Sequence, residues 1–175
     1  MIGPDQPELI GRVALATALG ALVGLERELS EKAAGLRTLA LVALGAASFT
    51  VAGYAAFGLP DFLQIKPDPN RIAAQVVSGI GFLGAGIIIF TGGRVIGVTT
   101  AADLWAVAAI GLLCGVGLLV VASVVAGLTV FVVAGLRPAE RALERFRQRG
   151  EPAERPGRGS REEPRGGAGP PRPPS

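Results

Sequence analysis

The sequence has no histidine and a single cysteine, and both scarcities narrow the functions open to it. Without histidine, it lacks the commonest metal ligand and the commonest general base of proteins. Cys114 stands inside an apolar run, so no disulfide framework is available. Glu26 and Glu28 would point to different faces of a helix instead of forming a carboxylate pair. We therefore expect a protein that is not an enzyme, with no catalytic residues, no metal site and no cofactor.

Charge is scarce as well, at 18% of the residues, where a soluble domain of this length carries about 25%. Residues 137–175 hold ten of the 17 basic residues and six of the 14 acidic residues. The seven basic and eight acidic residues that remain in 1–136 fall almost entirely between apolar runs. Because a charge at the centre of a bilayer is costly, this distribution, with a mean hydropathy of +0.49, indicates an integral membrane protein.

Five apolar segments are long enough to form short spans. Three cover residues 9–25, 36–57 and 72–90, and the last two divide a charge-free block from 104 to about 136. As one helix that block would be roughly 50 Å long, whereas a bilayer core is about 30 Å thick. Gly115-Val116-Gly117 offers a break near its middle. We therefore predict an all-α membrane protein, a bundle of about five short transmembrane helices.

The basic residues predict the orientation of the bundle. Lys and Arg follow the first and third spans and fill the tail, whereas the opposite side holds fewer: Lys66, Arg71 and Arg12. Because cytoplasmic segments carry the Lys/Arg excess, we expect the N-terminus outside and the C-terminus in the cytoplasm. An odd number of spans satisfies this arrangement.

Three regions follow from the composition. Residues 1–136 form the transmembrane domain. Residues 137–149 carry apolar side chains at helical spacing with arginines between them, which predicts an amphipathic interfacial helix. Residues 150–175 consist mostly of Pro, Gly, Arg and Glu, so they cannot bury a core and should be disordered.

Small residues recur within the spans and favour close helix packing, because lipid supplies no hydrophobic drive between helices. The glycines that we expect to serve packing are Gly20, Gly24, Gly79, Gly81, Gly84 and Gly86. An alternative is a kinked third helix beside a polar cavity. The match of residues 79–84 to the dinucleotide fingerprint lacks the alternating strands and helices that such a site needs.

Polar residues at the span ends are the candidate functional residues, because ionisable groups at membrane depth are usually paired inside the bundle. Glu26 with Arg37 is the pair that we expect. Asp68 precedes a proline and reads as a helix N-cap, and Thr100 with Asp103 has capping-box spacing. The alternative is that these residues only anchor helix ends. The candidates are Glu26, Arg27, Arg37, Thr38, Asp68, Arg71, Gln75, Thr99, Thr100 and Trp105.

Three blocks of this sequence resemble the MgtC/SapB family and occur in the family's order. They are residues 24–28 with 34–38 (GLERE and AGLRT), residues 68–86, and residues 97–111. The resemblance covers about residues 9–136. It implies a bacterial inner-membrane protein with about five spans, associated with growth under magnesium limitation and, in some pathogens, with survival inside host cells. Many members continue after the membrane part into a soluble domain similar to ACT domains, where this sequence has only the interfacial helix and the tail. Asp103 is a second departure, because the resemblance leads us to expect an uncharged residue there.

The leading hypothesis is a non-enzymatic regulator linked to magnesium limitation, acting through helix contacts with a membrane partner. The first alternative is a permease for Mg²⁺ or another cation. The second is a membrane scaffold whose tail binds acidic lipid or partners. The expected partners are the lipid bilayer and a membrane protein, and the Gly20-xxx-Gly24 face also permits a homodimer. We expect no nucleic-acid partner.

Overall fold

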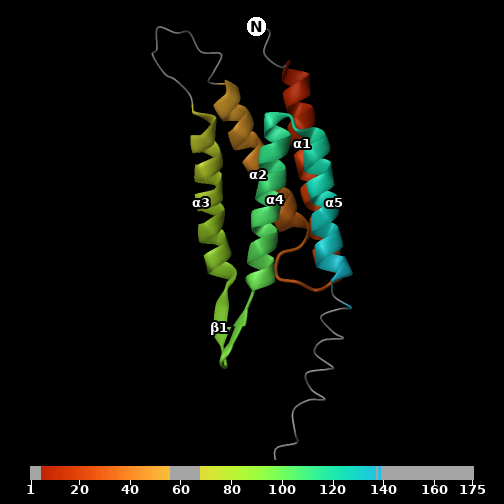
Figure 1. Cartoon of the computed structure of the whole chain (residues 1–175), viewed down its shortest axis with the longest axis vertical. Coiled ribbons are helices and arrows are strands. Elements are labelled where there is room, and N and C mark those ends of the chain that lie inside the picture. The colour runs from red at the N-terminus through yellow and green to blue at the C-terminus, as the bar shows by residue number, and fades with distance from the viewer. Residues whose placement is uncertain (1–4, 56–67, 137, 139–175) are drawn as a thin grey trace, which may run out of the picture.

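A bundle of five helices makes up most of the computed structural model, which describes residues 5–55, 68–136 and 138 (Figure 1). A β-hairpin joins the third helix to the fourth and extends past the end of the bundle (Figure 1). The elements are α1 (Gln6–Leu29), α2 (Leu36–Ala55), α3 (Pro69–Ile87), β1 (Ile89–Thr91), β2 (Arg94–Ile96), α4 (Val98–Val116) and α5 (Leu119–Gly135). The predicted all-α bundle is confirmed. The expected interfacial helix and tail, apart from residue 138, lie outside the described residues.

Three of the helices are long and apolar enough to cross a membrane: α1, α2 over residues 36–54, and α4. α5 is a shorter apolar helix of 17 residues. α3 places Asn70, Arg71 and Gln75 in its first two turns, so its beginning is polar and its remainder is apolar. These apolar helices agree with the membrane location that the sequence composition indicated.

The long apolar block divides at Gly117, as predicted. Gly117 has a φ of +99°, a left-handed conformation that glycine adopts without the steric cost of a side chain. Its backbone N–H donates to the carbonyls of Leu113 and Cys114, and the N–H of Leu118 donates to Leu113. These bonds satisfy the last carbonyls of α4, so the helix ends and α5 begins two residues later.

Small residues set the distances between α2 and its two main neighbours, α1 and α4. A Cβ built on Gly20 of α1 would lie 2.6 Å from the Cβ of Ala43 on α2. A Cβ on Gly111 of α4 would lie 2.7 Å from the Cβ of Ala46. Gly24 lies equally close to the backbone at the start of α2. The three helices thus meet through glycine and alanine, with larger side chains such as Leu39 filling the buried space between them.

The glycines of α3 behave differently from those of α1. A Cβ on Gly84 would make an ordinary 3.5 Å contact with Ala101 of α4. Contrary to the expectation of packing, a Cβ on Gly79, Gly81 or Gly86 would meet no atom within 4 Å. The reason is that α3 contacts α4 through its other face, where Ile80 and Gly84 are buried.

The third span is shorter than predicted because its last residues form a strand. α3 ends at Ile87, and β1 pairs antiparallel with β2 in a register that places Phe90 opposite Val95. Gly92 and Gly93 have φ values of +59° and +77°, which a two-residue hairpin turn requires. Two glycines between short apolar runs carried this signal in the sequence.

The fourth helix begins earlier than the sequence suggested. Gly97 occupies the N-cap position with a φ of +90°, so Thr100 and Asp103 lie inside α4 and form no capping box. The expected N-cap of α3 is confirmed, because the Asp68 side chain accepts a hydrogen bond of 2.9 Å from the backbone of Asn70, directly after Pro69. Because α4 begins earlier than expected, the carboxylate of Asp103 lies in the buried part of the bundle.

Replacing either close-packed glycine by leucine should destabilise the bundle by about 1–3 kcal/mol through overpacking. We expect this for Gly20→Leu and Gly111→Leu, measured as the free energy of unfolding in mixed detergent micelles. Gly127→Leu is the matched control, because a Cβ on Gly127 of α5 meets nothing within 4 Å. Equal stability of all three variants would show that these helices are not held by close contact.

Candidate functional site

The most deeply buried charges of the described chain are an arginine and an aspartate that join α1 to α4. Nε of Arg27 lies 2.9 Å from Oδ2 of Asp103, with the side chains 3% and 5% exposed. Nη2 of Arg27 also donates to Oγ1 of Thr100 over 3.1 Å. Burying a lone charge costs several kcal/mol, so each of these charges depends on the other.

The local sequence explains why these groups meet. Arg27 stands in the last turn of α1, one turn after Gly24, where the absence of a side chain lets the start of α2 approach. Thr100 and Asp103 are three residues apart and therefore share one face of α4. The guanidinium group reaches both with separate nitrogen atoms. Thr100 was among the predicted candidates, and its role here is to orient Arg27.

A second arginine joins the same two helices at their other ends. Nη1 of Arg12 donates to the carbonyl of Gly115 over 3.2 Å, and Nη2 pairs with Glu8 at 2.5 Å. A cation at this place also meets the negative end of the α4 dipole. Arg12 and Arg27 are 15 residues apart on α1, roughly 22 Å along a helix. α1 is therefore fixed to α4 at both ends, which the sequence analysis missed by treating Arg12 as a topology signal.

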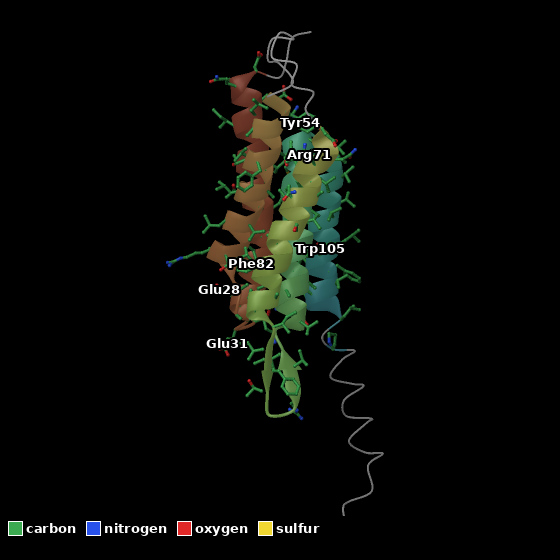
Figure 2. All side chains as sticks on the ribbon, turned by 90° about the vertical axis from the view of Figure 1, so that its left-hand side faces the viewer. Glu28, Glu31, Tyr54, Arg71, Phe82 and Trp105 are labelled. Carbon is green, nitrogen blue, oxygen red and sulfur yellow. The ribbon has the colours of Figure 1, made fainter. Side chains whose placement is uncertain are left out.

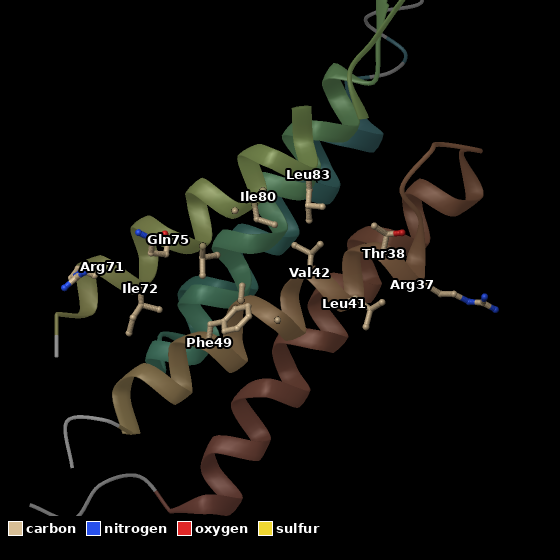
Figure 3. Close-up of a pocket in the computed structure, with 14 residues that line it drawn as sticks. Arg37, Thr38, Leu41, Val42, Phe49, Arg71, Ile72, Gln75, Ile80 and Leu83 are labelled. Carbon is tan, nitrogen blue, oxygen red and sulfur yellow. The ribbon is translucent and has the colours of Figure 1, made fainter. Parts of the chain in front are cut away.

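The expected pair of Glu26 with Arg37 is replaced by the pair of Arg27 with Asp103. Glu26 is half-buried and accepts a 3.1 Å hydrogen bond from Oγ of Ser30. Arg37 is exposed and points away from the bundle (Figure 3). The physical reason is the rotation of about 100° between neighbouring helix positions, which turns Arg27 toward α4.

α2 and α3 enclose an open groove with a cavity volume of about 930 Å³ (Figure 3). Four of the predicted candidates line it, namely Arg37 and Thr38 on α2 and Arg71 and Gln75 on α3. A Cβ on Gly53, near the end of α2, would contact Ile72 at the start of α3, so the two helices are antiparallel. Arg37 and Arg71 consequently lie at opposite ends, and the lining between them is apolar.

The remaining candidates stand apart from both features. Asp68 is exposed and caps α3. Thr99 is exposed at the start of α4, and Trp105, in the middle of that helix, is 57% exposed (Figure 2). Among the described residues, no group of three His, Cys, Asp or Glu side chains could hold a metal ion. The structure thus offers a buried ion pair and a lateral groove as the features with functional potential.

Removing one member of the buried pair should destabilise the protein far more than removing both. Asp103→Leu leaves the Arg27 charge buried alone, so we expect a loss of about 3–5 kcal/mol in the free energy of unfolding. The double variant Arg27→Met with Asp103→Leu should recover most of that loss. Glu8→Gln, which breaks the exposed pair with Arg12, is the control and should cost under about 1 kcal/mol. A double variant as unstable as the single one would contradict the pairing.

Comparisons with known proteins agree with the resemblance found in the sequence. Residues 13–142 match the MgtC family. Protein MgtC of Brucella suis biovar 1 (strain 1330) is 48% identical over 129 residues, which cover 74% of this chain and 51% of the relative. Protein MgtC of Salmonella typhimurium (strain LT2) is 53% identical over 103 residues, 58% of this chain and 41% of the relative. The chain thus spans about half the length of the curated relatives it matches.

No solved structure matches the chain. The family match covers α2 to α5 completely and α1 from Val13 onward, and therefore includes Arg27, Asp103 and the groove. Three helices of the chain, α1, α2 and α4, are long and apolar enough to cross a membrane. The chain is a membrane protein that belongs to the MgtC family.

Proposed function

We propose that this chain is a multi-pass protein of the bacterial inner membrane that regulates a partner membrane protein through helix contacts, without catalysis. Its link to magnesium limitation follows from the resemblance to the MgtC/SapB family. Because the chain spans about half the length of the relatives, the activity of the whole protein is part of this proposal. The observation that carries it is an exposed face of small residues on α3.

This face consists of small residues that point away from the bundle. Ala74, Ser78, Gly81 and Ala85 are all exposed and are spaced so that they share one side of α3. Phe82, 81% exposed, flanks them (Figure 2). In lipid, helices associate through close van der Waals packing, which small residues permit. A partner helix could approach α3 here as closely as α1 approaches α2.

The buried ion pair favours a regulator over a cation permease. Mg²⁺ prefers oxygen ligands and retains much of its water, so its path would need accessible carboxylates or carbonyls. Asp103 is the carboxylate that lies deepest among the described residues, and the Arg27 guanidinium already neutralises it. A divalent cation approaching Asp103 would also meet the positive charge of Arg27, which repels it.

Gly81→Leu should abolish recovery of a specific partner when the tagged protein is purified from native membranes, because the leucine side chain occupies the approach path. Gly127→Leu introduces the same side chain on α5, where an added Cβ also meets nothing within 4 Å, and should leave recovery unchanged. Recovery of a second copy of this chain alone would identify a homodimer. Equal recovery with both variants would rule out this face of α3.

The proposed orientation can be tested with single cysteines in a Cys114→Ala background. Thr91→Cys lies on the hairpin and Asn70→Cys at the opposite end of α3, and both positions are exposed. With the N-terminus outside, a membrane-impermeant maleimide added to intact cells with a permeabilised outer membrane should label position 70 and not position 91. Labelling of position 91 alone would invert the topology.

A further inference from the structure

The groove between α2 and α3 lies on the outside of the bundle and has apolar walls with polar residues at its ends (Figure 3). A surface of this kind on membrane helices is in contact with lipid. We propose that the groove binds one anionic phospholipid, with the phosphate against Arg71 and Gln75 and an acyl chain along the apolar lining. This inference is independent of the partner contact proposed above.

The dimensions of the groove suit a lipid chain. Its lining on α3 extends from Arg71 to Leu83, twelve residues or roughly 18 Å along a helix. Half of a bilayer core measures about 15 Å, so the groove is as long as one leaflet is deep. The volume of about 930 Å³ lies within the range of protein sites for small ligands.

Glycines keep the groove open along its length. Gly45 of α2 and Gly79 of α3 both line it, and a Cβ on either would meet no atom within 4 Å. Gly79 therefore does not serve helix packing, and its missing side chain leaves space in the groove. A side chain introduced at either position would begin in the groove, at a Cβ that contacts no protein atom.

The charge distribution places the headgroup at the Arg71 end. Arg71 and Gln75 lie one turn apart on α3 and both line the groove, so they offer several N–H donors to one phosphate. Among the described residues, no acidic side chain forms an ion pair with Arg71. The nearby Asp68 carboxylate instead accepts a hydrogen bond from the backbone of Asn70. Within residues 5–55 and 68–136, the positive charge of Arg71 is thus not neutralised by an ion pair.

The opposite end is less suited to a phosphate. The side chain of Arg37 extends outward from this end of the groove, as that of Arg71 does at the other end (Figure 3). The Glu28 carboxylate accepts a hydrogen bond from the backbone of Leu36, directly before Arg37, and so places a negative charge beside it. Acyl chains gain little by moving from the bilayer into an apolar groove, so the headgroup contacts determine the preference.

Fluorescence quenching by brominated lipids tests the proposal on the full chain. Phe49 lines the groove, so Phe49→Trp in a Trp105→Phe background places a reporter there. In phosphatidylcholine vesicles, brominated phosphatidylglycerol should reach half-quenching at about one fifth of the mole fraction that brominated phosphatidylcholine requires. Arg71→Gln should remove this preference. Arg94→Gln, at an exposed arginine on β2, should retain it.

Native mass spectrometry of the chain without the reporter provides the second measurement. From micelles containing both lipids, the protein should retain one phosphatidylglycerol molecule, Gly79→Leu should lose it, and Gly127→Leu should keep it.

Equal quenching by the two lipids would show that the groove contacts only the annular lipid that surrounds any membrane helix, and it would overturn the proposal. Loss of the preference with Arg37→Gln, but not with Arg71→Gln, would also overturn it, because the headgroup would lie at the other end.

Discussion

The ion pair between Arg27 and Asp103 is the interaction on which the arrangement of the bundle depends. Neither charge is stable alone in the low-dielectric space between membrane helices, so α1 and α4 must lie at the separation and rotation that bring them together. Glycines make that separation possible, since α2 contacts both helices at distances that exclude larger side chains. Close packing and charge pairing are therefore two aspects of one constraint: a polar contact can be buried here only because the backbones approach closely.

The helices outside this arrangement are held differently. α3 contacts α4 through Ile80 and Gly84, while much of its surface faces outward. Of its two remaining sides, one carries exposed small residues and the other lines the groove with α2. The closely packed helices α1, α2 and α4 thus leave much of α3 exposed, and both proposed contacts, with a partner helix and with a phospholipid, involve that helix.

The sequence predicted the features that local chemistry determines. The apolar helices, the break at Gly117 and the N-cap at Asp68 depend on neighbouring residues, and all are present, although α3 ends earlier and α4 begins earlier than expected. The Arg27–Asp103 pair could not be predicted, because it depends on the rotation of α1 relative to α4 across more than 70 residues of chain. Glu26 and Arg27 are adjacent, and a rotation of about 100° decides which of them faces the interior. The hairpin was missed because apolar residues continue without interruption from α3 into β1.

Arg12 and Arg27 together fix the position of α1 along the axis of α4. Arg12 donates a hydrogen bond to the Gly115 carbonyl at one end of the helix pair, and Arg27 forms an ion pair with Asp103 at the other end. A slide of α1 along α4 by a single residue, about 1.5 Å, would have to change the geometry of both contacts at once. The two contacts therefore oppose a change of register between α1 and α4 at both ends of the helix pair.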